Sequence, residues 1–192
     1  MAANLLSQRQ TAIMNARQVI EQNPVYLDTE TTGLEKTDEI VEISIVDEAG
    51  NILLDSLVKP SQSIPASAIR IHGITNDMVQ KAPAWPILWQ QVRPLVIGKR
   101  IVAYNSDFDS RLIKQSFDRY RLPMKETLAF FDLMKLYSRF RGDWDPGRQQ
   151  YRYFSLEQAG KSANIALPNA HRSTADTLLT RELLHYIAAQ TA

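Results

Sequence analysis

The sequence predicts an α/β fold in which helices flank a mixed central sheet of about five strands. Apolar segments of strand length come first in close succession, at about 25–29, 40–47 and 51–58, and the turn sequence EAGN joins the last two as a hairpin. Farther along the chain, apolar strands alternate with helical segments, as in sheets that carry helices on their faces. Antiparallel pairing followed by strand–helix alternation therefore indicates a mixed sheet.

The helices and the remaining strands follow from local patterns. Residues 4–22 carry apolar side chains at roughly helical spacing, which predicts an amphipathic helix before the first strand. Ser155 and Gln158 match a capping box, so we expect a helix to begin there. In chain order, the other expected elements are short helices and loops over 64–83, a helix over 84–97, a strand at 100–105, a helix over 107–120, a strand at 127–133 and a last helix over 173–189.

The composition limits the class of protein. A chain of 192 residues with 44% hydrophobic residues suits one globular domain. The formal net charge of +1 predicts no broad attraction to nucleic acid, so any site for a polyanion must be local. The absence of cysteine excludes disulfides, zinc–thiolate sites and thiol nucleophiles. No apolar run approaches the ~20 residues of a membrane span and no secretory signal opens the chain, so we expect a cytoplasmic protein with no membrane partner.

The segment VYLDTETTGLE places two acids at the end of the first strand. Asp28 and Glu30 are two residues apart, so their side chains point to the same face with origins ~6–7 Å apart, and Gly33 lets the chain turn sharply after them. Two carboxylates that face one spot repel each other unless a cation or a proton lies between them. Such oxygen ligands suit Mg²⁺ or Mn²⁺. The alternative is a pair of acids at a strand end that faces water.

Two further motifs supply a second set of polar residues. In YNSDFDSRLI, Asp109 begins a helix after a buried strand, although an acid there can also simply complement the helix dipole. In AHRSTADTLLT, His171 and Asp176 are five residues apart and cannot share one face of a continuous helix. We therefore expect His171 in the loop before the last helix and Asp176 in its first turn, with Ser173 as the cap. An ordinary loop histidine is the alternative for His171.

The order of these motifs resembles the DnaQ-like 3′–5′ exonucleases of the DEDDh group, which include the proofreading epsilon subunit of bacterial DNA polymerase III, ribonuclease T and oligoribonuclease. The resemblance covers about residues 25–188 and includes IHGIT at 71–75. It implies a ribonuclease H-like exonuclease domain over 23–192, preceded by a helical extension over 1–22. It implies that two divalent cations, Mg²⁺ or Mn²⁺, are bound by Asp28, Glu30, Asp109 and Asp176. It also implies that His171 is the general base.

This assignment fits the chemistry of phosphodiester hydrolysis. Two ions ~3.5–4 Å apart can serve both the attacking hydroxide and the leaving oxygen, and four carboxylates balance their charge. An imidazole with a pKa near ~6.5 can take the proton of the water. We expect a metal-dependent 3′–5′ exonuclease that releases nucleoside 5′-monophosphates, with single-stranded DNA slightly favoured. The alternatives are an RNA-directed exoribonuclease and a non-catalytic module that docks on a partner such as a polymerase; a homodimer is also open.

The resemblance also suggests substrate-binding residues. Leu34 resembles the apolar residue that wedges against the terminal base, and the turn from Thr31 to Gly33 offers backbone N–H groups to the terminal sugar or phosphate. His72 either contacts the nucleotide or closes its own loop. Asn105 and Phe108 are expected to shape the pocket. Tyr104 stands where family members often carry histidine, so a hydrogen bond made by that histidine is in doubt here.

Two features have competing interpretations. Residues 139–153 resemble an insertion in which four arginines alternate with aromatic residues. That mixture suits stacking on bases and pairing with phosphates along a single strand, whereas structural packing of the aromatics is the alternative. Glu42 is an acid in an otherwise apolar strand, and we expect it beside the metals rather than as a ligand.

Overall fold

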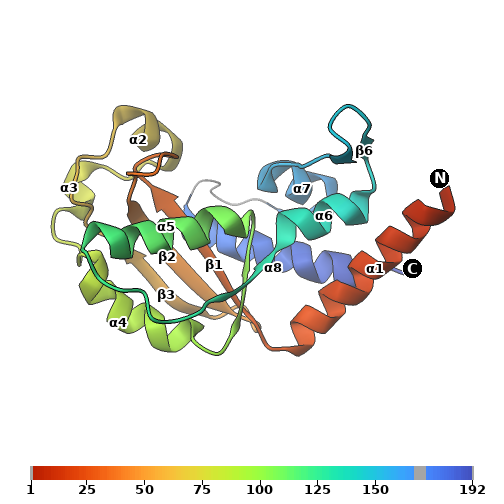
Figure 1. Cartoon of the computed structure of the whole chain (residues 1–192), viewed down its shortest axis with the longest axis horizontal. Helices are drawn as coiled ribbons and strands as arrows, with labels where there is room; N and C mark the ends of the chain where they lie inside the picture. The colour runs from red at the N-terminus through yellow and green to blue at the C-terminus, as the bar shows by residue number, and fades with distance from the viewer. Residues whose placement is uncertain (1, 167–171, 192) are drawn as a thin grey trace.

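The central sheet of the computed structural model has five strands in the order β3-β2-β1-β4-β5 (Figure 1). The structure describes residues 2–166 and 172–191, with side chains from residue 8 onward. Strands β1, β2 and β3 pair antiparallel, whereas β4 and β5 run parallel to β1, so the predicted mixed sheet is confirmed. The strands are β1 (Val25–Thr31), β2 (Ile40–Asp47), β3 (Ile52–Leu57), β4 (Arg100–Ala103) and β5 (Ala129–Asp132).

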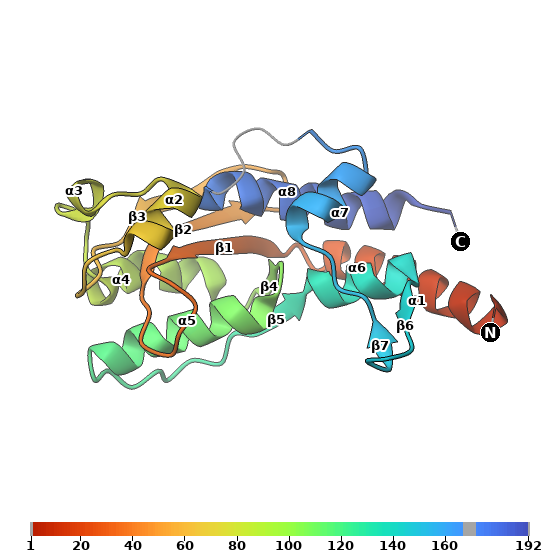
Figure 2. The same cartoon turned by 90° about the horizontal axis from the view of Figure 1, so that it is seen from above.

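Helices cover both faces of this sheet (Figure 2). One face packs against α4 and α5, and the other packs against α8 together with α1 and α6. Within the described part of the chain, no helix combines the length and the apolar character needed to cross a bilayer. The helices are α1 (Ala2–Glu21), α2 (Ala66–His72), α3 (Asn76–Val79), α4 (Trp85–Val96), α5 (Ser106–Arg119), α6 (Leu133–Arg141), α7 (Leu156–Ser162) and α8 (Ser173–Ala189).

The alternation of side chains along β1 decides where its acids point. Val25 and Leu27 are buried in the core on the α4 and α5 side, whereas Tyr26 is buried in the core that contains α8. Because side chains two apart on a strand share a face, Asp28 and Glu30 lie on the same face as Tyr26. The two acids therefore face α8.

Helix α1 packs into the core beside the end of the chain. Its residues Ile13 and Ala16 are buried in one cluster with Phe140 of α6 and Leu184 of α8. The guanidinium of Arg9 lies 3.9 Å from the centre of the Phe140 ring. The helix expected over 4–22 is thus confirmed. Its apolar side chains are covered by α6 and α8.

Helix α6 was not predicted. The strand expected at 127–133 is shorter, because the side chain of Asp132 accepts a hydrogen bond from the backbone N–H of Lys135 and starts a helix. Gly142, in the left-handed conformation, ends it. The segment 139–153 is therefore the end of α6 followed by a small hairpin, instead of one irregular insertion. That hairpin consists of β6 (Trp144–Asp145) and β7 (Gln150–Tyr151).

The predicted capping box of α7 is confirmed in both directions. The backbone N–H of Gln158 donates to the Ser155 hydroxyl over 3.1 Å, and the backbone N–H of Ser155 donates to the Gln158 side chain over 3.0 Å. Two of the otherwise unpaired N–H groups at the helix start are satisfied in this way.

Candidate metal centre

Three carboxylates from two distant elements meet beside β1. Asp28 and Glu30 project from the strand, and Asp176 comes from the first turn of α8, which packs across β1. Each of the three offers an oxygen within 4.8 Å of the others. The structure therefore brings together three of the four acids that the sequence singles out as metal ligands.

Asp109 lies next to this cluster with its carboxylate held by a neighbour. It stands in the first turn of α5 and is 2% exposed. Its Oδ1 accepts a hydrogen bond of 2.8 Å from the hydroxyl of Thr29, which lies between the two acids of β1. Asn105 adopts a left-handed conformation, with φ 65°, and turns the chain from β4 into α5. Thr29 was not predicted as part of the site, because it faces away from Asp28.

The acids raise one another's pKa. Burial, followed by the charges of Asp109, Asp176 and Glu30, raises the pKa of Asp28 well above its usual value. Burial and the charge of Asp176 raise the pKa of Glu30 to about 8. Burial also raises the pKa of Asp109 to about 7, against the hydrogen bond from Thr29. Carboxylates this close cannot all ionise unless positive charge joins them, which is the property of a site for hard divalent cations.

Proton release should therefore accompany metal binding. At pH 7 we expect Mg²⁺ to displace about one proton per protein, because Glu30, with its pKa of about 8, is mostly protonated in the metal-free site. Calorimetric titration in two buffers of different ionisation enthalpy measures this number. The release should fall when the titration is repeated at pH 9. A heat of binding that is the same in both buffers at pH 7 would contradict the expectation.

An ion pair between the buried Glu42 and the exposed Arg172 fixes the start of α8 on the sheet. Glu42 of β2 is 1% exposed and accepts hydrogen bonds from the guanidinium of Arg172 and, over 2.9 Å, from the backbone N–H of Ser173. Burial acts to raise the pKa of Glu42, but the hydrogen bonds from Arg172 and Ser173 outweigh it and hold that pKa below its usual value. Glu42 thus caps the helix that carries Asp176, and Ser44 adds a 2.7 Å bond to the Ser173 hydroxyl.

The expected cap of α8 was wrong. The N-cap position belongs to Arg172, and no side chain of its own segment caps the helix. The Ser173 hydroxyl bonds to β2 instead, because Glu42 already accepts from the first N–H of the helix. Arg172 itself follows His171 directly, yet the sequence offered no pattern that would pair it with an acid 130 positions earlier.

Glu42→Ala should destabilise the protein by about 1–2 kcal/mol, because it removes a helix cap and the hydrogen bonds from the exposed Arg172 guanidinium. Chemical denaturation of the metal-free protein at pH 7 measures this change. Glu126→Ala, which breaks an exposed pair with Arg93, is the matched control and should change stability far less. Equal effects of the two substitutions would show that Glu42 does not hold α8.

A pocket of about 550 Å³ adjoins the acids on the α2 side. Leu34 stands on its rim with 75% of its surface exposed, and Phe108 of α5 lines the opposite part. Arg111 fixes the rim, since its guanidinium donates to the backbone oxygen of Leu34 over 3.2 Å. A Cβ at Gly33, in the turn before Leu34, would lie 2.5 Å from the carboxylate of Asp38, which would have to move from its hydrogen bonds with Thr32 and Glu35.

His72 lines the same pocket but is committed to its own loop. Its Nδ1 accepts a 3.0 Å hydrogen bond from the backbone N–H of Ile74, and its Nε2 lies 3.2 Å from the backbone oxygen of Thr31. Since Nδ1 accepts, Nε2 carries the proton and donates, so the ring is neutral. Burial lowers the pKa of His72 further. Of the two roles expected for this residue, the structure favours closure of the loop around Thr31.

His171, expected as the general base, lies outside the described residues. The turn residues Thr31, Gly33 and Leu34 and the helix residue Phe108 all line the pocket beside the acids. Asn105 is not among the residues that line it, and its left-handed backbone turns the chain into α5. Tyr104 donates its hydroxyl to the backbone oxygen of Phe154 and so joins the turn between β4 and α5 to the segment before α7.

Comparison with known proteins agrees with this arrangement. The model of the family described as Exonuclease matches residues 25–184. The chain is 38% identical to the uncharacterized exonuclease CP81 of Escherichia phage 186 over 93% of this chain and 94% of that protein. It also matches longer relatives, such as the PolC-type DNA polymerase III of Bacillus subtilis, and spans 13% of that protein.

Solved structures share the architecture. Exonuclease X in complex with 5′ overhanging duplex DNA superposes with a TM-score of 0.62 at 28% identity, and the match covers 88% of this chain and 94% of that one. The nuclease domain of 3′hExo, a DEDDh family member bound to rAMP, superposes with a TM-score of 0.68 at 17% identity, covering 84% and 89%. At this lower identity, the similarity to the 3′hExo domain supports only a shared fold.

Proposed function

This chain belongs to the exonuclease family and is a 3′–5′ exonuclease of the DnaQ-like type, and we propose that it uses divalent metal ions to release nucleoside 5′-monophosphates from single-stranded DNA. Its mixed five-stranded sheet with helices on both faces is the ribonuclease H-like fold of such enzymes. The observation that carries the proposal is the cluster of Asp28, Glu30 and Asp176 beside Asp109, in which raised pKa values call for cations.

The four acids would hold two ions, Mg²⁺ or Mn²⁺. When bound, such ions lower the pKa of the attacking water and neutralise charge on the scissile phosphate. Asp28 and Glu30 approach from the sheet, whereas Asp176 approaches from α8, whose start is fixed by Glu42. His171, one residue before Arg172 at that fixed start, would accept the proton of the water through its imidazole.

The pocket between the first strand and α2 would receive the terminal nucleotide. Leu34 and Phe108 offer apolar surface to its base, and the turn that ends in Gly33 brings backbone groups toward its sugar. The Thr31 hydroxyl already donates to the backbone oxygen of Gly33 over 2.7 Å and therefore shapes this turn from within. His72 would support the turn without touching the nucleotide, since both of its ring nitrogens have protein partners.

Leu34→Ala should raise KM for a single-stranded oligonucleotide by about tenfold, because the exposed side chain loses its contact with the terminal base, worth about 1–2 kcal/mol. Steady-state kinetics at saturating Mg²⁺ measures the change. Calorimetry on the same variant should show the metal affinity of the wild type. The control is Ile87→Ala, which truncates an exposed side chain of the same size on α4. It should leave KM unchanged. A parallel loss of metal affinity in Leu34→Ala would contradict this assignment.

The ligands in the solved structures of similar proteins favour DNA as the substrate and leave RNA as the alternative. Exonuclease X was solved with duplex DNA, whereas the 3′hExo domain was solved with rAMP. DNA is the better supported of the two, because the structure with DNA also has the higher sequence identity and matches nearly its whole length. A preference for DNA would arise from the contacts that meet the 2′ position of the terminal sugar.

A time course on matched 5′-labelled DNA and RNA oligonucleotides tests the proposal. With Mg²⁺ or Mn²⁺, a ladder that shortens from the 3′ end is expected for single-stranded DNA, and none with chelator. Faster shortening of RNA would replace DNA by RNA as the substrate. Shortening that persists in chelator would overturn the metal-dependent mechanism.

A further inference from the structure

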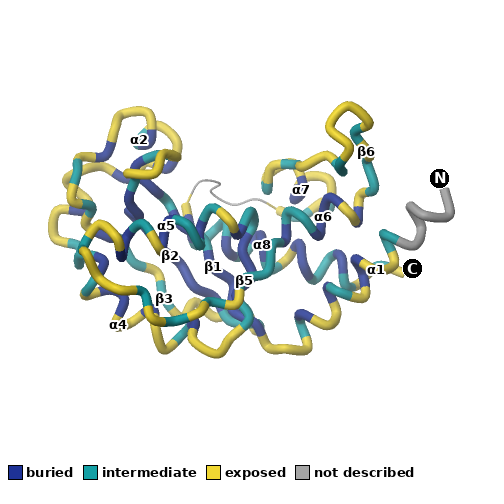
Figure 3. The backbone as a smooth tube through the Cα atoms, viewed as in Figure 1, coloured by how far each residue is buried: buried dark blue, intermediate teal, exposed yellow. Residues whose placement is uncertain are grey.

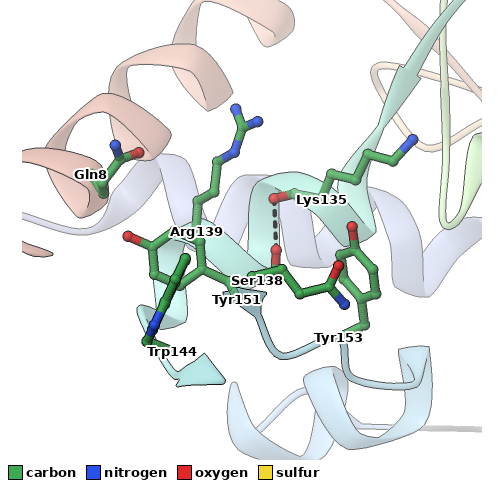
Figure 4. Close-up of a pocket in the computed structure, with 8 residues that line it drawn as sticks. Gln8, Lys135, Ser138, Arg139, Trp144, Tyr151 and Tyr153 are labelled. Carbon is green, nitrogen blue, oxygen red and sulfur yellow. Dashed lines mark hydrogen bonds between the residues drawn. The ribbon is translucent and has the colours of Figure 1, made fainter. Parts of the chain in front are cut away.

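We propose that the pocket enclosed by α1, α6 and the β6–β7 hairpin binds the single-stranded nucleic acid that leads away from the 3′ end. The inference rests on the proposed function and extends it to the length of strand that the enzyme holds. The pocket has a volume of about 470 Å³ and shares no lining residue with the pocket of the terminal nucleotide. Helix α1 is far from α6 and the hairpin in the sequence, yet its Gln8 lines the pocket together with residues of both (Figure 4).

Aromatic side chains in this pocket remain exposed. Trp144 and Tyr153 keep 50% and 48% of their surface open. Trp144 packs against Tyr151 in a T-shaped pair, at 5.2 Å between ring centres and 80° between planes, and half of its surface remains open to a base. Phe140, by contrast, is buried in the core. Of the two interpretations of segment 139–153, packing applies to Phe140, and stacking on bases fits Trp144 and Tyr153.

The charge of the pocket is positive. Arg139 lines it together with Lys135, whose Nζ is paired with Asp107 and Asp132, and no carboxylate lines it among the described residues. Within the same described part of the chain, the guanidinium of Arg139 has neither a hydrogen-bond acceptor nor an ion-pair partner in the protein. Between residues 135 and 152 there are five cations and two acids, whereas the whole chain has a net charge of +1. The positive charge is thus concentrated where a phosphate backbone would lie.

The acids of this segment do not neutralise the pocket. Asp143 pairs with Arg141, and Asp145 accepts from the backbone N–H groups of Gly147 and Arg148 in the hairpin turn. Asp143 therefore pairs with a cation that does not line the pocket, and Asp145 shapes the hairpin turn. The turn of the hairpin is exposed, as the yellow tube at its tip shows (Figure 3). An acidic protein surface would meet the same charges, but it would not explain two open aromatic rings beside them.

Lys135 connects the pocket to the metal centre. Its Nζ bonds to the carboxylate of Asp107 and lies 3.3 Å from that of Asp132. Asp107 belongs to the first turn of α5, next to Phe108 of the terminal-nucleotide pocket and two residues before Asp109. A strand whose 3′ end lies at the acids can therefore pass Lys135 and reach the exposed rings of the hairpin.

Trp144 provides a direct test of binding that does not depend on cleavage. The other two tryptophans are buried, Trp85 at 2% and Trp89 at 8% exposure, so Trp144 dominates the fluorescence that a bound base can quench. In chelator, an oligothymidylate of about 12 nucleotides should quench the emission, and a dinucleotide should quench it much less. The quenching should disappear in Trp144→Phe. Quenching that persists in Trp144→Phe would overturn the proposal.

Kinetics test whether the pocket acts on the reaction. Arg139→Ala combined with Trp144→Ala should raise KM for the longer oligonucleotide by about fivefold or more, with a much smaller effect on the dinucleotide. Arg139→Ala alone should make the slope of log affinity against log salt shallower by about 0.7, the amount expected for one lost phosphate contact with a single strand. Lys99→Ala, at an exposed cation before β4, is the control and should change neither quantity.

The outcomes separate this inference from the proposed function. If neither oligonucleotide is cleaved with metal but the long one quenches Trp144, the exonuclease mechanism fails and the strand-binding pocket stands. If cleavage proceeds normally and the variants affect long and short substrates equally, the pocket does not bind the strand. A protein partner would then be the alternative occupant of this surface.

Discussion

Asp28→Asn should lower the rate of cleavage by at least about 10³-fold, the loss expected when a group that stabilises charge in the transition state is removed. Asparagine has nearly the same shape but cannot supply the negative charge that offsets a divalent cation. The measurement is kcat on single-stranded DNA at saturating Mg²⁺, together with metal affinity by calorimetry. Asp118→Asn, at an exposed position of α5 away from the cluster, is the control and should retain full activity.

The same substitution should stabilise the metal-free protein at high pH. The folded-state pKa of Asp28 is raised, so its contribution to stability is complete below the pKa of the unfolded chain and is lost as pH rises through the folded pKa. Glu30, with a pKa of about 8, loses its contribution between about pH 4.5 and 8. In chelator at pH 9, Asp28→Asn should therefore melt several degrees above the wild type, and at pH 4 the two should nearly coincide.

Added Mg²⁺ should reverse that order. At pH 9 the ions should raise the Tm of the wild type strongly, because they replace the missing protons, and should raise that of Asp28→Asn only weakly. Differential scanning calorimetry with and without chelator measures both effects. Full activity of Asp28→Asn, or an equal response of both proteins to Mg²⁺, would rule out the proposed metal site.

His171→Ala should lower kcat by about 10²- to 10⁴-fold, the usual contribution of a general base. Only a neutral imidazole can take the proton of the water, so the wild-type rate should rise with pH through about 6.5 and then level off. The variant should lose this rise, whereas its metal affinity should remain. Rate measurements between pH 5 and 9 at saturating Mg²⁺ test this, and added imidazole should restore part of the activity.

His185→Ala is the matched control for this experiment. His185 belongs to the same helix as Asp176 but lies beside Glu48, and its removal should leave the pH profile as in the wild type. An unchanged pH profile in His171→Ala would mean that another group accepts the proton. Loss of metal affinity in that variant would assign His171 a structural part in the site instead.

Helices and strands were predictable where a short stretch of sequence contains the whole signal. The hairpin of β2 and β3 followed from a turn sequence, and α7 followed from a capping box whose partners are three residues apart. Helix α6 was missed although Leu133, Leu136 and Phe140 have helical spacing, because the aromatic and basic residues after it resembled an insertion. Its start also depends on a single capping bond from Asp132.

The sequence by itself predicted four acids as the site, three of which the structure brings together, and determined on which face two of them lie. Asp28 and Glu30 must share a face because the side chains of a strand repeat every two residues. That Asp109 bonds to Thr29 and that Glu42 holds the start of α8 depends on contacts across 80 and 130 positions. The pocket beside Trp144 likewise needs α1 to pack against α6. Local spacing fixes direction along an element, whereas only the packing of elements brings distant side chains within bonding distance, and tertiary structure alone decides that.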